Sequence, residues 1–129
     1  MNSTNITATT ENTALPKDYL SNGYKTTEGK CDARYVASYA AEIAANLAPM
    51  DKERFRAFYR EIDLNARNPI DQKQRLLHQL ATRAYKFVQR NQAPKIFYEF
   101  MKRNAEAVTD HKSYNDFIDH MEAIYCYMI

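Results

Sequence analysis

The sequence predicts an all-α fold, a compact bundle of about five helices. Apolar residues recur at intervals of three and four, which is typical of helices, and no stretch alternates as a half-buried strand would. No glycine follows Gly29. Pro49, Pro69 and Pro94 fall between the apolar segments and mark helix boundaries. A length of 129 residues suits a single domain.

Composition divides the chain into three parts. Residues 1–14 are rich in Ser, Thr and Asn and carry little apolar bulk, which predicts a disordered tail. Residues 15–31 contain the turn pair Asn22-Gly23 and are expected to form an ordered but irregular lead-in. Residues 32–129 are expected to form the helical bundle domain.

The first two helices are predicted from their ends and their apolar faces. Asp32 is the expected N-cap of a helix over 32–48, and a second helix should run from about residue 51 to just before Pro69. Their inward-facing residues are expected to be Tyr35, Val36, Tyr39, Ala40, Ile43 and Leu47 in the first helix and Phe55, Phe58, Tyr59 and Ile62 in the second.

Three further helices are predicted from the same signals. Asp71 is the expected cap of a third helix that continues to about Asn91, and Pro94 suits the first turn of a fourth. A fifth is expected from about Ser113. Their apolar faces comprise Leu76, Leu77, Leu80, Ala84, Phe87 and Val88, then Ile96, Phe97, Phe100 and Met101, then Tyr114, Phe117, Ile118, Met121, Ile124, Tyr125 and Met128.

Bulk composition excludes several classes of protein. The chain has 18 basic and 16 acidic residues, so attraction to a polyanion would require segregation of charge. The two cysteines, Cys31 and Cys126, form no zinc-binding spacing and are interpreted as free thiols of a reducing compartment. No apolar run is long enough to cross a bilayer, and no signal peptide is recognised, so a cytoplasmic protein is expected.

Positive charge is segregated on the predicted third helix. No acidic residue occurs from Gln72 to Asn91, and the four bases Arg75, Arg83, Lys86 and Arg90 fall within an arc of about 80° beside the apolar face. Arg56, Arg60 and Arg67 share a similar arc on the second helix. The two helices are therefore predicted to contribute to one cationic surface.

Two explanations of this surface remain open from the residues alone. Like charges on one helix face repel, so a partner of opposite charge would relieve them. That partner is either internal, through Asp116, Asp119 and Glu122 of the last helix lying across from the third, or external. Arginine and lysine on a rigid helix suit contacts with nucleic-acid phosphates, which position a backbone without reading its sequence.

Catalysis is disfavoured by the sequence. Asp116 and His120 stand at i,i+4 near Asp119 and Glu122, which raises a metal-dependent enzyme as the weakest hypothesis, but a solvated acidic face explains them better. No Ser/His/Asp order, glycine-rich phosphate loop or nucleotide fingerprint is present. We therefore expect no catalytic residue, no bound metal and no cofactor.

Four stretches also have a familiar order and spacing: "YLSNGYKTTEGKCDARYVASYAAEIAANL", "RFRAFYREI", "LHQLATRAYKF" and "FIDHMEAIYCYMI". Over about residues 19–129 the chain resembles the small subunit of type III-A CRISPR effector complexes, the Csm small subunit. The resemblance implies a five-helix protein without catalytic activity, acting in antiviral defence. It also implies partners: CRISPR RNA and target RNA, backbone repeat subunits, the large polymerase-like subunit and neighbouring copies of itself.

Carried over by position, the resemblance implies RNA-backbone contacts without sequence specificity through the basic helical face. The expected RNA-binding residues are Arg56, Arg60, Arg75, Arg83, Lys86 and Arg90. The alternative is a protein interaction adaptor, whose basic face docks an acidic patch on a partner subunit.

Overall fold

The computed structural model describes residues 14–129 and confirms the all-α fold. The predicted tail at 1–14 lies outside the described residues, apart from Ala14. In the part described, a four-residue extended segment and a 3-10 helix precede five α-helices. Their bounds are β1 Ser21–Tyr24, η1 Ala33–Val36, α2 Ser38–Asn46, α3 Lys52–Leu64, α4 Ile70–Gln89, α5 Lys95–Ala107 and α6 His111–Tyr127.

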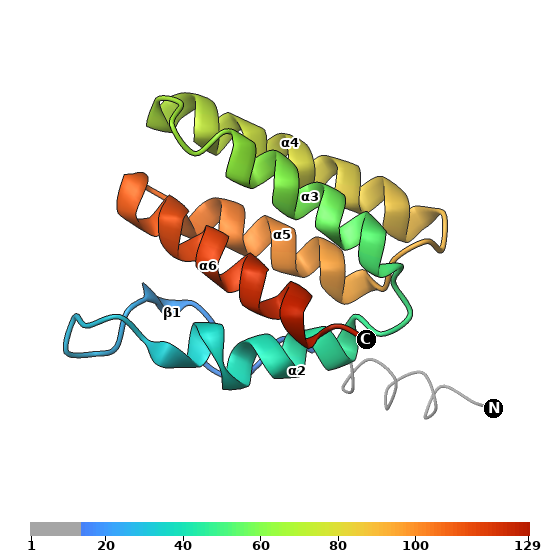
Figure 1. The fold of residues 1–129 in the computed structure, drawn as a ribbon, viewed down its shortest axis with the longest axis horizontal. Coiled ribbons are helices and arrows are strands. Elements are labelled where there is room, and N and C mark those ends of the chain that lie inside the picture. Colours follow the sequence, from blue (N-terminus) through green and yellow to red (C-terminus); the bar gives the residue numbers. More distant parts are fainter. Residues whose placement is uncertain (1–13) are drawn as a thin grey trace.

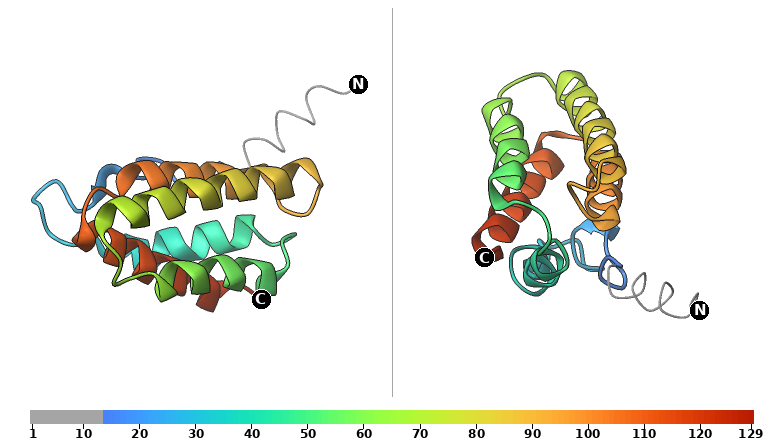
Figure 2. Two further views of the ribbon diagram at one scale, coloured as in Figure 1. Left: turned by 90° about the horizontal axis from the view of Figure 1, so that it is seen from above. Right: turned by 90° about the vertical axis from the view of Figure 1, so that its right-hand side faces the viewer.

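The helices lie in three tiers (Figure 1). Helices α3 and α4 form the upper tier, α5 and α6 the middle one, and α2 with β1 the lower one. The end-on view in Figure 2 shows α3 above α6 on one side and α4 above α5 on the other, with α2 below. Helix α4 packs mainly against α5, whereas α6 packs against α2 and α3. None of the helices between residues 14 and 129 combines the length and apolar character needed to cross a membrane.

Every α-helix contributes to a single hydrophobic core. Most of the predicted inward-facing residues are buried there, and the largest that are fully buried include Phe55, Phe97, Phe100, Phe117, Ile43, Leu47, Ile62, Leu77 and Leu80. Tyr59 and Tyr125 are only half-buried at the edge of the core. Val36 was predicted to face inward, and this is wrong, because 48% of it is exposed.

The predicted helix over 32–48 is divided in two. Asp32 accepts a hydrogen bond from the backbone N–H of Arg34 and so caps the short 3-10 helix η1, not a long α-helix. Ala37 then leaves helical geometry, with φ −132° and ψ −102°, and α2 begins at the next residue. The break frees the Tyr35 carbonyl to accept a hydrogen bond from the buried His120 of α6. The same break turns Val36 toward solvent.

Three other helix ends differ from the prediction. Helix α3 ends at Leu64, so Arg67 lies beyond it in a turn and does not share its face. Helix α4 begins at Ile70, and Asp71 lies in its first turn without capping it. Helix α6 begins at His111, two residues earlier than expected, because Asp110 and Ser113 form a reciprocal capping box.

A buried polar network joins the segment 15–31 to the bundle. The Asn104 amide donates to the Tyr19 hydroxyl at 2.9 Å and accepts from the Tyr24 hydroxyl at 2.6 Å. Tyr19 also lies 2.6 Å from His120 Nε2, and Arg103 donates to the Tyr19 carbonyl. Buried polar groups are costly unless they are paired, and these residues satisfy one another. The segment before η1 is therefore anchored in the core.

His120 must be neutral in this network. Its Nδ1 faces the Tyr35 carbonyl, which can only accept, so Nδ1 carries the hydrogen and Nε2 accepts from the Tyr19 hydroxyl. Burial lowers the pKa of His120 to about 4, since a charged imidazole is disfavoured away from water. The hydrogen bond to Tyr35 acts in the opposite direction and only partly offsets burial.

This lowered pKa predicts acid sensitivity. Below pH 6.5 the unfolded chain protonates His120 while the folded chain does not until about pH 4, so the free energy of unfolding should fall as pH decreases through this window. The loss should approach about 3 kcal/mol at pH 4. Urea unfolding at a series of pH values would measure it.

The matched comparison uses the two histidine variants His120→Gln and His78→Gln. His78 is exposed on α4 and makes no side-chain contribution to the network, so its variant should keep the full pH dependence. The His120 variant should be less stable at neutral pH and should lose most of the slope between pH 6.5 and 4. An unchanged slope in that variant would contradict the assignment.

Candidate nucleic-acid interface

The six predicted RNA-contacting residues are all exposed, and they lie on two neighbouring helices. As a set we call them the cationic face: Arg56 and Arg60 on α3, with Arg75, Arg83, Lys86 and Arg90 on or directly after α4. The α3 residues that contact α4 are Arg54 and Glu61. Arg56 stands about 140° around the helix from Glu61 and so lies on the side of α3 away from α4. The opposite side of α4 buries Leu77, Leu80 and Ala84. The helical period therefore forces the bases of α4 outward when its apolar side packs on the core.

Two members of the cationic face form ion pairs. Arg83 Nη1 lies 3.1 Å from Glu61 Oε2, which joins α4 to α3, and Arg56 Nη1 lies 3.5 Å from Glu53 within α3. Both pairs are solvent-exposed, so each contributes little to stability. The remaining four, Arg60, Arg75, Lys86 and Arg90, form no ion pair with any residue between 14 and 129.

The acidic residues of α6 do not neutralise α4. Asp116, Asp119 and Glu122 were considered as an internal partner for the basic helix, but α6 packs against α2 and α3. Asp116 instead pairs with Lys112 of its own helix, at 3.3 Å. Glu61 of α3 supplies the internal carboxylate, and it reaches Arg83 alone. Most of the exposed bases on α4 thus have no carboxylate partner among the described residues and can pair with an external anion.

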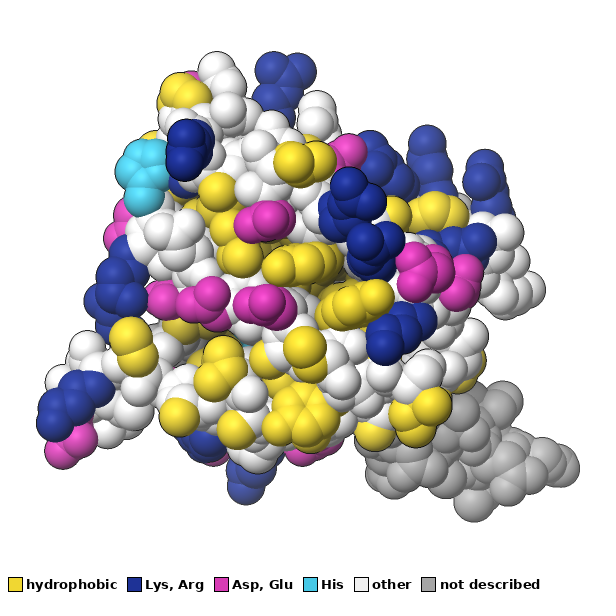
Figure 3. Space-filling model, in the orientation of Figure 1, with side chains coloured by type: hydrophobic (Ala, Val, Ile, Leu, Met, Phe, Trp, Pro, Cys, Tyr) yellow, Lys and Arg dark blue, Asp and Glu magenta, His cyan; other side chains and the backbone are white. Residues whose placement is uncertain are grey.

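The distribution of charge is visible on the surface (Figure 3). Dark-blue side chains gather in the upper right of this view, where α3 and α4 lie, with a few acidic neighbours. Acidic side chains form a row across the middle of the same face, and apolar ones gather below it. The protein therefore separates cationic, anionic and apolar surface, although its net charge is only +2.

Two basic residues have roles that sequence patterns did not reveal. Arg54 stacks over the Phe87 ring at 4.9 Å, which adds a positive charge at the seam of α3 and α4. Lys73 of α4 is buried, and its Nζ lies 2.9 Å from the Ala66 carbonyl and 2.7 Å from His111 Nδ1. Burial lowers the pKa of Lys73. Lys73 therefore fixes the α3–α4 turn and is not part of the cationic face.

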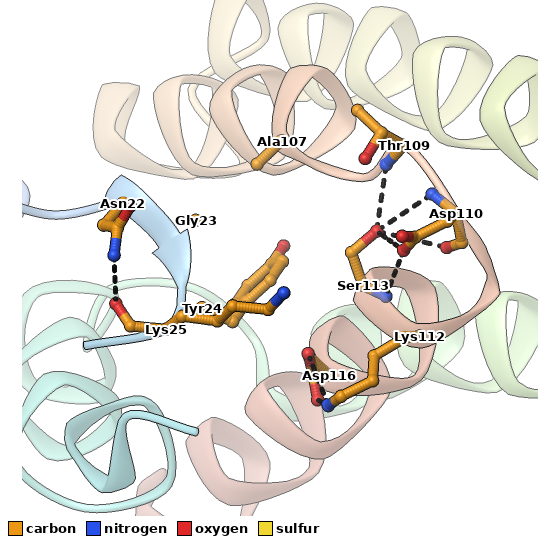
Figure 4. A pocket seen from close by; sticks show the side chains of 10 residues that line it. All are labelled: Asn22, Gly23, Tyr24, Lys25, Ala107, Thr109, Asp110, Lys112, Ser113 and Asp116. Atoms are coloured by element: carbon orange, nitrogen blue, oxygen red, sulfur yellow. Dashed lines mark hydrogen bonds and ion pairs between the residues drawn. The ribbon is translucent and has the colours of Figure 1, made fainter. Parts of the chain in front are cut away.

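The structure separates the residues of the candidate metal site. His120 is buried with both ring nitrogens in hydrogen bonds, whereas Asp116 is half-buried and pairs with Lys112. The polar pocket in Figure 4 lies between β1 and the start of α6, and Asp116 and Lys112 line it. Within residues 14–129, no group of three or more His, Cys, Asp or Glu is placed to hold a metal ion.

The free thiols expected from the sequence are present in the described chain. Cys31 and Cys126 are both exposed, and neither forms a disulfide. Cys31 Sγ lies 3.6 Å from Lys112 Nζ.

Comparison with known proteins identifies the family. The family model described as Csm2 Type III-A matches residues 30–128. No curated protein and no solved structure matches the chain significantly. The match spans η1 and all five α-helices, including those that carry the cationic face, and it confirms the resemblance seen in the sequence motifs. The chain therefore belongs to the Csm2 family, the small subunits of type III-A CRISPR effector complexes.

Proposed function

We propose that this small subunit holds the backbone of guide and target RNA through its cationic face, without catalysis and without sequence specificity. The observation that carries the proposal is the exposed side of α4 from Gln72 onward, which contains no acid and where Arg75, Lys86 and Arg90 form no ion pair with a described residue. Membership of the Csm2 family supports it, because such subunits assemble within an RNA-guided complex.

The geometry of α4 suits a nucleic-acid backbone. From Arg75 to Arg90 the bases extend over roughly 22 Å of helix, a length that spans several phosphates of one strand. Arginine presents a planar fork that binds phosphate oxygens in pairs, and lysine acts as a point charge. Contacts of this kind position RNA, while pairing between guide and target supplies the choice of sequence.

Neighbouring subunits complete the proposal. We infer that the protein packs against the backbone repeat subunits, the large polymerase-like subunit and further copies of itself, in the cytoplasm and in antiviral defence. Each contact with RNA is weak alone, but subunits tethered side by side raise the effective concentration of one another's sites. RNA association should therefore be measured in the assembled complex as well as with the isolated protein.

Removal of single bases from α4 should weaken RNA binding. Arg83→Ala and Lys86→Ala should each weaken RNA binding similarly for unrelated sequences, because the contacts are to phosphates. The plot of log affinity against log salt should lose about 0.7 of its slope for each phosphate contact removed. Fluorescence anisotropy with labelled single strands, from low to high salt, would measure both effects.

Lys30→Ala is the matched control, since Lys30 is exposed in the segment between β1 and η1. In Figure 1 that segment lies in the lower part of the molecule and α4 at the top. It should leave the salt slope unchanged. RNA association that is absent, or independent of salt, in both isolated and assembled protein would overturn the proposal. If the α4 variants block assembly but leave RNA protection unchanged in each complex that forms, the basic face docks a protein and the adaptor hypothesis is correct.

Removal of the Glu61 carboxylate should have the opposite effect on RNA binding. Glu61→Gln removes the carboxylate that holds Arg83, so that arginine becomes available and a repulsive charge is lost. RNA affinity should rise by about twofold to fivefold, with little change in the unfolding midpoint, since the pair is exposed. Glu28→Gln, which changes an exposed acid outside the bundle, should leave affinity unchanged. Equal or lower affinity of the Glu61 variant would show that Arg83 does not contact RNA.

A further inference from the structure

A second surface of the molecule is acidic and apolar, in contrast to the cationic face. A shallow groove between η1 and the second half of α6 is lined by Val36, Asp119, Glu122, Ala123, Cys126 and Tyr127. Val36 is 48% exposed and Tyr127 is 50% exposed, both high for large apolar residues in a protein of this size. We call these six residues the acidic-apolar face.

The apolar part continues across α2. Tyr127 also lines an adjoining groove with Ala41, Ala45 and Ala48, so the two grooves share one wall. Figure 3 shows apolar side chains gathered over this lower part of the molecule, where α2 and the end of α6 lie. The break at Ala37 contributes, because it turns Val36 outward next to Tyr127.

The acidic part continues across the seam of α3 and α6. Burial raises the pKa of the half-buried Tyr59, and the charges of Glu122 and Asp63 raise it further, followed by Cys126 and Asp119. None of the three acids forms an ion pair with a residue between 14 and 129. In Figure 3 the acidic row lies directly above the apolar patch.

Cations lie at the edge of this surface, but none in residues 14–129 forms an ion pair with Asp63, Asp119 or Glu122. Arg34 is held by Asp32 at 2.7 Å, Lys112 is held by Asp116 at 3.3 Å, and Lys52 of α3 lies over the Tyr125 ring of α6 at 4.7 Å. The acids facing the groove therefore remain available to pair with cationic groups of a partner, and they repel a phosphate backbone. A partner that covers this face must supply both an apolar side chain and positive charge.

We propose that the acidic-apolar face docks a different protein subunit of the complex, one that presents an apolar side chain flanked by lysines or arginines. Apolar contact at the centre supplies affinity, and complementary charge at the rim supplies orientation. The choice of a different protein over a second copy rests on the proposed function, because RNA then occupies the cationic face of each copy.

Photo-crosslinking in the assembled complex tests the proposal. A photo-crosslinking amino acid in place of Ala123, at the centre of the face, should link to a Lys- or Arg-rich peptide of another subunit. The same amino acid in place of Thr82, exposed on α4, serves as the comparison and should link to RNA. Mass spectrometry would identify the products, and isotope-labelled copies of this chain would reveal contacts between copies.

Each outcome decides one question. Crosslinks from position 123 to RNA, to a second copy, or to nothing would overturn the docking face. Crosslinks from position 82 to protein alone would overturn the RNA proposal but leave the docking face standing. The two failures are thus distinguishable within one experiment.

Charge reversal gives a second measurement. The double variant Asp119→Lys and Glu122→Lys should lower incorporation into the complex by at least about tenfold, because the cationic rim of the partner would be repelled. Its helical content should remain unchanged, since both acids are exposed. The matched double variant Glu28→Lys and Glu106→Lys adds the same charge elsewhere and should assemble normally. Equal incorporation of the two double variants would contradict the proposal.

Discussion

The buried hydrogen bonds around Tyr19 and His120 are the constraint on which the rest of this structure depends. They connect the segment before η1, the break before α2, the middle of α5 and the middle of α6. Such a network is stabilising only when every member is paired, because an unpaired polar group in the core costs more than an apolar one. Its geometry therefore fixes how the lower tier sits on α6, and with it the shape of the acidic-apolar face.

The upper tier, α3 and α4, is held in place by different interactions. Helices α3 and α4 are held by apolar packing and by Lys73 beneath their connecting turn, and the exposed Glu61–Arg83 pair adds little. Within residues 14–129 the side chains of the cationic face are exposed, so they remain solvated and adaptable. This suits contact with a backbone that presents the same phosphate at every step. The two faces thus differ in what supports them as well as in charge.

Most of the fold could be predicted from local patterns, because helical spacing and prolines act within one segment. The helices around Phe55, Leu80 and Phe117 were found this way. The break at Ala37 was not, since it depends on a carbonyl that His120 needs from across the core. The helix face carrying Arg75 and Arg83 was visible in sequence, but only packing shows that Glu61 lies opposite one of them. The prediction for Val36 was wrong for the same reason, since Val36 stands next to the break.

The network also shows what a shorter chain would lose. The segment shared with the Csm2 family spans residues 30–128, yet Tyr19 and Tyr24 lie before it. A chain shortened to the matched segment would lose the Tyr19 and Tyr24 hydroxyls, which leaves Asn104 Oδ1 and His120 Nε2 without their buried partners. Asn104 would still donate to the Phe100 carbonyl and His120 would still contact the Tyr35 carbonyl. The matched range therefore omits residues that the core of this chain uses, and shortening the chain to it should lower the stability of the bundle.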